Sequence, residues 1–188
     1  MSEPYPIIFL GESGVGKTSI IKLLTNGKFD PNEKPSFAPK FVRKTFEFFD
    51  KSVFHNDIWD NAGEYKYRSL STVYLKNAKA VILVYNVTDE KSFIELKDYW
   101  YDLAKQKTHK DTVFAVVANK SDLYGQKQVA NETGEEFAKK IGALFFSTSA
   151  KDDSSFEDFI RTINLKIEDA HTNKLNKGNE DLDIEDNA

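Results

Sequence analysis

Short apolar runs alternate along the chain with longer segments of helical period. The runs span residues 7–10, 80–85, 113–118 and 144–146, and they are rich in β-branched and aromatic side chains. Such runs are typical of parallel strands that are buried on both faces of a sheet. Two other segments carry apolar residues at the spacing of one helix face, namely Phe93, Leu96, Trp100 and Leu103, and then Phe156, Phe159, Ile160, Ile163 and Ile167.

The stretch from Phe41 to Asp60 has a different pattern. Two strand-like runs, 41–49 and 53–59, are joined by a turn at Asp50-Lys51-Ser52, which indicates an antiparallel hairpin. We therefore predict an α/β doubly wound fold: a six-stranded, mostly parallel sheet with one antiparallel edge strand and about five helices on both faces. In such folds ligands bind at the carboxyl ends of the strands.

Two helix starts show the pattern of a capping box. In each, a hydroxyl residue is followed three positions later by a glutamate: Thr133 with Glu136, and Ser154 with Glu157. We expect helices to begin at these positions.

Length and composition exclude several classes of protein. The 188 residues suit one domain, and the chain has no cysteine. Disulfides, thiolate zinc sites, catalytic thiols and acceptors for prenyl or palmitoyl groups are therefore absent from it. Neither a signal peptide nor a myristoylation glycine follows Met1, and no apolar run could span a membrane. We expect a cytoplasmic protein with no direct lipid anchor, whose membrane association, if any, is made through a partner.

The formal net charge of −4 is concentrated at the carboxyl terminus. Residues 178–188 carry five acidic side chains and no basic one, which leaves 25 acidic and 26 basic residues in the remainder. A nearly neutral domain offers no electrostatic footprint for nucleic acid. We predict one domain over residues 1–174 and an acidic disordered tail over residues 175–188.

The segment from Gly11 to Thr18 reads G-E-S-G-V-G-K-T and matches the phosphate-binding loop pattern. It follows a predicted strand and opens a predicted helix, as the pattern requires. Glycines let consecutive backbone N–H groups point at phosphate oxygens, and the helix terminus adds a positive dipole end. Lys17 would reach the β- and γ-phosphates, and the Thr18 hydroxyl would bind Mg²⁺. The alternative is a glycine-rich turn with no ligand.

Four further segments occur in an order that resembles the Ras-like small GTPases, most closely the Rab branch. They are Pro35-Ser36, Asp60-Asn61-Ala62-Gly63, Asn119-Lys120-Ser121-Asp122 and Ser149-Ala150-Lys151. Stretches typical of the Rab branch are Trp59-Asp60, Tyr67-Arg68-Ser69-Leu70, residues 83–88 and Ser92-Phe93. The likeness covers residues 5–174.

The resemblance implies a GTP/GDP site. Asp122 would select guanine because it accepts hydrogen bonds from groups that adenine lacks, and the Ala150 N–H would meet the guanine O6. Phe29 would pack against the base, although it could instead be a core aromatic residue. The residues assigned to the nucleotide are Ser13, Gly14, Val15, Gly16, Lys17, Thr18, Ser19, Phe29, Ser36, Gly63, Asn119, Lys120, Asp122, Ser149, Ala150 and Lys151.

The same resemblance implies a metal site and a switch. Mg²⁺ would be held by Thr18, Ser36 and Asp60, and the Gly63 N–H would bind the γ-phosphate. Loss of that phosphate would release switch I, residues 29–40, and switch II, residues 62–76. Exchange factors, activating proteins and effectors would bind at these two segments.

The sequence departs from the family pattern at the catalytic position. Glu64 stands where the family usually has the glutamine that positions the attacking water. Together with Lys17 and Gly63 it forms the expected catalytic set. A glutamate can act as a base on the water, or charge repulsion can displace it and leave hydrolysis slow. Switch I also departs, because Ala38-Pro39-Lys40 replaces the usual glycine and acidic residue.

Three functions remain open on the sequence. The first is a regulatory GTPase that hydrolyses GTP slowly in vesicle trafficking. The second is a guanine-nucleotide-binding interaction module with little or no hydrolysis. The third is a phosphate-loop kinase for small molecules, for which residues 119–122 and 149–151 would be coincidences.

Overall fold

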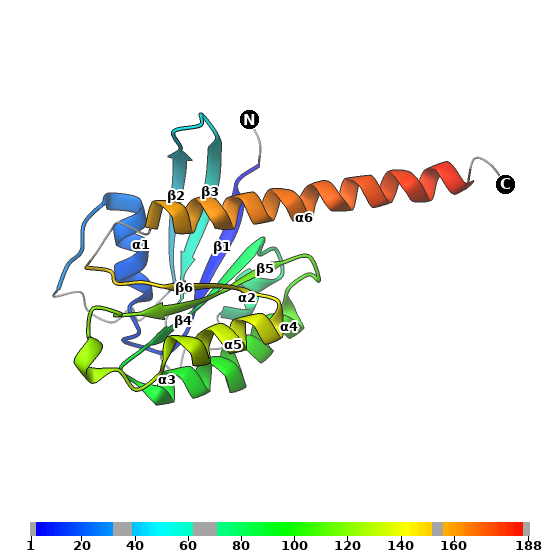
Figure 1. The fold of residues 1–188 in the computed structure, drawn as a ribbon. Coiled ribbons are helices and arrows are strands. Elements are labelled where there is room, and N and C mark those ends of the chain that lie inside the picture. The colour runs from blue at the N-terminus through cyan, green and yellow to red at the C-terminus, as the bar shows by residue number, and fades with distance from the viewer. Residues whose placement is uncertain (1–2, 32–38, 62–70, 152–155, 186–188) are drawn as a thin grey trace.

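One mixed sheet forms the centre of the molecule, with strand order β2-β3-β1-β4-β5-β6 (Figure 1). The structure, a computed structural model, describes residues 3–31, 39–61, 71–151 and 156–185. The strands are β1 (Tyr5–Leu10), β2 (Lys40–Glu47), β3 (Val53–Asp60), β4 (Ala80–Asn86), β5 (Val113–Asn119) and β6 (Leu144–Ser147). Edge strand β2 pairs antiparallel with β3, and the other pairs are parallel. The predicted sheet and its antiparallel edge are confirmed.

Helices cover both faces of this sheet. In Figure 1, α1 and α6 lie on one face, and α2, α3, α4 and α5 lie on the other. Their bounds are α1 (Lys17–Asn26), α2 (Ser71–Leu75), α3 (Glu90–Glu95), α4 (Asp102–Lys107), α5 (Asn131–Ile141) and α6 (Phe156–Glu185). A π-helical turn, η2 (Leu96–Tyr101), joins α3 to α4, and η3 (Tyr124–Gln126) is a short 3-10 helix. With α3, η2 and α4 taken as one continuous helix, the described residues contain the five expected helices.

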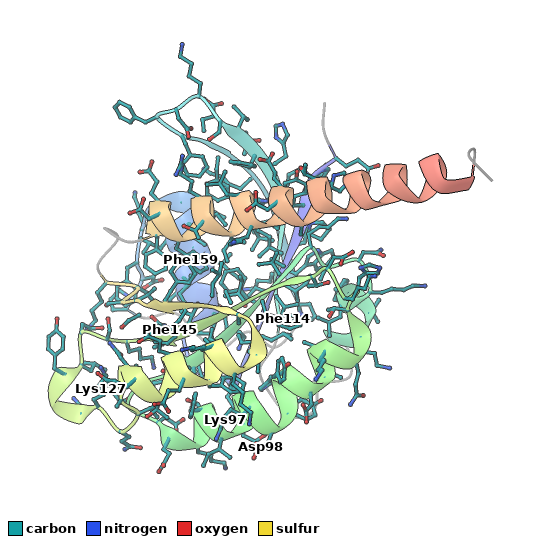
Figure 2. The ribbon with its side chains drawn as sticks, turned by 45° about the vertical axis from the view of Figure 1, so that its right-hand side comes forward. Lys97, Asp98, Phe114, Lys127, Phe145 and Phe159 are labelled. Atoms are coloured by element: carbon teal, nitrogen blue, oxygen red, sulfur yellow. The ribbon has the colours of Figure 1, made fainter. Side chains whose placement is uncertain are left out.

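The alternation of side chains along the strands separates two apolar cores. Ile7 and Phe9 of β1 pack with α1 and α6, whereas Ile8 and Leu10 pack with the helices on the opposite face. Figure 2 labels Phe159 beneath α6 and Phe145 between β6 and α5, one on each side of the sheet. Burial on both faces explains why the parallel strands are apolar almost throughout.

The structure differs from the sequence-based expectations at two helix positions, Thr133 and Leu103. Helix α5 begins at Asn131, so Thr133 lies inside the helix and is not its N-cap. The other predicted cap, Ser154, lies outside the described residues. In the continuous helix Ala104 is fully buried and Leu103 only partly, because the wide turn η2 shifts the later residues around the helix.

The carboxyl-terminal helix is longer than expected. We predict an acidic disordered tail over residues 175–188, but α6 continues to Glu185 and projects beyond the sheet (Figure 1). No proline interrupts residues 156–185, and helical hydrogen bonds are local, so the backbone can continue as a helix past Ile167, the last residue of α6 in the described core. The domain boundary at residue 174 stays a prediction.

Candidate functional site

A cavity of about 290 Å³ opens where the carboxyl ends of the central strands meet. Loops that follow β1, β5 and β6 line it, together with the start of α1 and the segment after it. The lining residues are Ser13, Gly14, Gly16, Lys17, Thr18, Ser19, Phe29, Asp30, Pro31, Asn61, Asn119, Lys120, Asp122, Leu123, Ser149, Ala150 and Lys151. The cavity therefore gathers residues that are up to 138 positions apart in the sequence, from Ser13 to Lys151.

The loop between β1 and α1 is built around glycines that no other residue can replace without strain. Gly14 and Gly16 have φ of +79° and +101°, in the left-handed region. A Cβ on Gly16 would lie 2.2 Å from Nδ2 of Asn119. This tight path brings the loop backbone against the cavity, as the binding of phosphate by consecutive N–H groups requires.

Lys17 begins α1 and is only 5% exposed. Its Nζ donates hydrogen bonds to the carbonyl oxygens of Gly11 and Glu12, both at 2.8 Å. Burial lowers the pKa of Lys17 to about 8, although the nearby carboxylates of Asp60 and Glu12 oppose that change. A buried ammonium group at the rim of this cavity is suited to bind an anionic ligand.

Thr18 and Asp60 form a cluster of oxygen atoms beside Lys17. The Thr18 hydroxyl donates to Oδ2 of Asp60 at 2.6 Å, across 42 positions of sequence. Hydroxyl and carboxylate oxygens are the donors that Mg²⁺ prefers, so these two residues fit the expected metal. Nowhere among the described residues do three or more His, Cys, Asp or Glu side chains converge on one point. A cation here would take its other ligands from elsewhere, such as phosphate oxygens and water.

Two side chains at the carboxyl end of β5, those of Asn119 and Lys120, link the far end of the cavity to the glycine-rich loop. Nδ2 of Asn119 donates to the carbonyl of Val15 at 2.8 Å, and Nζ of Lys120 donates to the carbonyl of Gly14 at 2.8 Å. Lys120 has φ of +63°, which turns the chain sharply after the strand. The loop beside the phosphate end is therefore held in register with the segment that would meet the base.

Asp122 is oriented by the segment that follows β6. The Ser149 hydroxyl donates to its Oδ1 at 2.7 Å, and Nζ of Lys151 lies 3.3 Å from its Oδ2. Burial alone would raise the pKa of Asp122, but the hydrogen bonds from Ser149 and Lys151 outweigh it and lower the pKa. The side chain is thus kept as an ionised acceptor facing the cavity.

The structure separates the remaining predicted residues into three groups. Phe29 lines the cavity and also packs against the core beneath α1, so its packing against the base stays a prediction. The Val15 side chain is buried in that core, which leaves only its backbone for a ligand. Ser36, Gly63 and Glu64 lie outside the described residues.

Four lining residues are absent from the sequence-based set: Asp30, Pro31, Asn61 and Leu123. Each directly follows a predicted residue or another of the four in the chain. The one feature of the sequence that could have identified these residues is their position next to a motif. The motifs do not indicate which neighbouring residue faces the cavity.

A parallel α/β sheet with this glycine-rich loop at the end of its first strand defines the class of phosphate-loop nucleotide-binding domains. The comparisons with known proteins are more specific. The sequence model of the Ras family matches residues 6–169. Ras-related protein Rab-22A of Canis lupus familiaris and of Mus musculus are each 32% identical to the chain over 173 residues, which cover 92% of this chain and 88% of theirs. Rab-22A of Homo sapiens is 32% identical over 168 residues, which cover 89% and 85%.

The chain therefore belongs to the Ras family, and its likeness places it in the Rab branch. Members of this family are GTP-binding switches with GTPase activity, and they are controlled by regulators and read by effectors. Among the helices in the described part of the chain, none has the length and apolar character needed to cross a bilayer.

Proposed function

We propose that the protein binds GTP and GDP with Mg²⁺ in this cavity, hydrolyses GTP slowly, and acts as a switch in vesicle trafficking. The observation that carries the proposal is the joining of two recognition elements in one cavity. The glycine-rich loop with Lys17 lies at one end, and the oriented carboxylate of Asp122 lies at the other. The first is suited to phosphates and the second to guanine.

The phosphate end acts by charge and by aligned donors. Backbone N–H groups of residues 13–18 would surround the phosphates at the start of α1, and Lys17 would exchange its carbonyl partners for phosphate oxygens. A bound phosphate would favour the charged form of Lys17, which burial disfavours.

The metal would be held by oxygen atoms of Thr18 and Asp60, which already lie 2.6 Å apart. Ser36 is the third proposed ligand and lies outside the described residues. Bound Mg²⁺ supplies neutralisation of phosphate charge. Asp60 would bind the metal through a water molecule.

Glu64 is the reason to propose a slow reaction. Its carboxylate can accept a hydrogen bond from the attacking water but cannot donate one to the phosphate, as a glutamine amide does. No arginine is present in the phosphate loop or in switch I, residues 29–40. Fast turnover would therefore need an arginine from a partner, which contributes about 10³–10⁵-fold in GTPases.

An aromatic stack supports partner binding next to the switch segments. Phe41 packs on Trp59 with ring centroids 4.9 Å apart, and Trp59 stacks on Tyr74 at 4.0 Å. Phe41 is 45% exposed, and the stack joins the strand after switch I to the helix within switch II. A change in either segment would therefore alter a surface on which an effector could dock.

The test is single-turnover hydrolysis of preloaded GTP with Mg²⁺, for the wild type beside Glu64→Gln. Conversion to GDP by the wild type at a rate equal to or above that of the variant supports Glu64 as a residue that positions water. Retention of GTP by the wild type, with hydrolysis by Glu64→Gln, favours the long-lived binding module instead. Failure to load guanine nucleotide at all would overturn the proposal.

A further inference from the structure

Trp100 lies in the turn η2, between α3 and α4, and its side chain is buried. Its one polar side-chain atom nevertheless contacts the glycine-rich loop. The side chain is 0% exposed and belongs to the core formed with α2, α3 and α5. Its Nε1–H donates a hydrogen bond to Oε1 of Glu12 at 2.8 Å, across 88 positions of sequence. Glu12 is the second residue of the loop, between Gly11 and Ser13.

This hydrogen bond is strong, and the buried indole N–H depends on it for an acceptor. The indole N–H is a donor only, and a buried donor needs an acceptor. The carboxylate of Glu12 makes the bond charge-assisted, which roughly doubles its strength over a neutral pair. Breaking it would remove the acceptor of a buried indole N–H and one of the contacts that hold the Glu12 side chain.

The same residue is also held through its main chain. The carbonyl oxygen of Glu12 accepts a hydrogen bond from Nζ of Lys17 at 2.8 Å. Glu12 is therefore bound on one side by Trp100 and on the other by Lys17. Glu12 thus links Trp100 to the loop backbone and, until a phosphate replaces its carbonyl, to Lys17.

The helix that presents Trp100 is locally irregular. Trp100 lies within η2, the π-helical turn between α3 and α4. Lys97 and Asp98 of the same turn mark its outer side in Figure 2, while Leu96 and Trp100 are its buried residues. Such turns insert an extra residue and occur frequently at functional sites.

We propose that Trp100 and Glu12 are positioning residues of the nucleotide site, which hold the phosphate loop in its binding conformation through one buried hydrogen bond. The inference rests on the proposed binding of guanine nucleotide. Neither Glu12 nor Trp100 is among the residues that line the cavity. Their contribution is preorganisation, because a loop that is already fixed loses less conformational freedom on binding.

The first test is the dissociation rate of a fluorescent N-methylanthraniloyl-GDP from the loaded full-length protein. Trp100→Phe and Glu12→Leu should each release the probe about tenfold faster, which corresponds to a change of about 1.4 kcal/mol. The double variant should release it no faster than either single variant, because both remove the same bond. Glu12→Gln should stay close to the wild type, since its amide oxygen can still accept from the indole.

The matched control is Tyr101→Phe. Tyr101 lies next to Trp100 in the same turn, but its ring contacts are with Phe114, Phe137 and Lys105, away from the loop. This variant should release the probe at the wild-type rate.

The second test reads the bond directly. The chain has two tryptophans, so a ¹⁵N–¹H spectrum should show two indole resonances, of which Trp100→Phe removes one. That resonance should move upfield in Glu12→Leu and move less in Glu12→Gln. If Trp100→Phe does not fold, the two Glu12 variants decide the question, because they alter only a loop side chain.

The possible failures can be distinguished. A wild type that never loads the probe overturns the proposed function. A wild type that loads normally, with variants that release at its rate or with additive effects in the double variant, overturns this inference alone. Equal rates for Glu12→Gln and Glu12→Leu, or an indole resonance that does not respond to Glu12, also overturn it.

Discussion

Asn56 of β3 and Asn164 of α6 exchange two hydrogen bonds through their side-chain amides. Nδ2 of Asn56 donates to Oδ1 of Asn164 at 2.8 Å, and Nδ2 of Asn164 donates back to Oδ1 of Asn56 at 3.0 Å. Both residues are 0% exposed, and Asn164 also donates to the carbonyl of Ile160. This polar pair sets the position of α6 along the sheet, because a shift of the helix would leave buried amides without partners.

The pair predicts a large effect of removing one member. Asn164→Ala should lower the free energy of unfolding by about 1–3 kcal/mol, since the Asn56 amide is left buried and unsatisfied. Thermal and urea unfolding measure this, with Asn77→Ala at an exposed position as the control. An Asn164→Ala protein as stable as the control would show that the pair does not hold the helix.

The carboxylate of Asp122 should make the site selective for guanine over other bases. In Asp122→Asn an amide of equal size replaces the carboxylate, so one acceptor that would meet the guanine N–H groups becomes a donor. GDP affinity should fall at least about tenfold, and the affinity for xanthosine diphosphate should rise relative to GDP because its C2 oxygen can accept. Competition titration against a fluorescent GDP checks this. Asp111→Asn, at the opposite end of the sheet, is the control, and equal GDP affinity in both variants would contradict the assignment.

Asp50 predicts a pH-dependent contribution to stability. Hydrogen bonds from Ser52 and Arg161 hold the pKa of Asp50 well below its ordinary value of 3.8. The ionised carboxylate therefore stabilises the fold fully above about pH 4, and this contribution is lost as the pH falls further. The melting temperature of the wild type should exceed that of Asp50→Asn at pH 6, and the difference should shrink from pH 4 downward.

The control for this prediction is Glu135→Gln, on the exposed side of α5. A difference between wild type and Asp50→Asn that is constant from pH 6 to pH 2.5 would exclude the carboxylate as its source. Because Arg161 is on α6, the contact of Asp50 also links the tip of the β2–β3 hairpin to that helix.

Tyr85 and Gly134 predict a coupled pair of substitutions. The Tyr85 hydroxyl is buried with no hydrogen-bond partner among the described residues, and a Cβ on Gly134 would lie 2.3 Å from it. Tyr85→Phe should therefore raise the free energy of unfolding by about 1 kcal/mol. Gly134→Ala should destabilise the wild type despite the gain in helix propensity. It should cost less in the Tyr85→Phe background, where the contact of the added Cβ with Cε2 of Phe145, at 2.8 Å, remains.

Denaturant unfolding of the four proteins in this cycle measures the coupling. Gly125→Ala is the control, since an added Cβ there meets nothing within 4 Å. Additive effects of the two substitutions would show that the hydroxyl is not what excludes a side chain at Gly134.

The order of the strands along the chain, the antiparallel edge and most of the residues that line the cavity could be predicted from short stretches of sequence. Apolar runs such as residues 80–85 identify buried strands because a strand covered on both faces has no polar side. The loop at residues 11–18 can be identified from the sequence because phosphate binding requires glycines at fixed spacing. Each of these features depends on residues that are close together in the chain, so a short stretch of sequence is enough to predict it.

Contacts between side chains that are far apart in the sequence could not be predicted in this way. The partners Glu12 with Trp100, and Asn56 with Asn164, are 88 and 108 positions apart. Their spacing has no periodicity, since each contact depends on how a helix packs across the sheet. The start of α5 at Asn131 and the turn η2 likewise depend on packing, which overrides the propensity of a capping box or a regular stripe. Contacts of this kind follow from the fold as a whole and cannot be read from a local pattern.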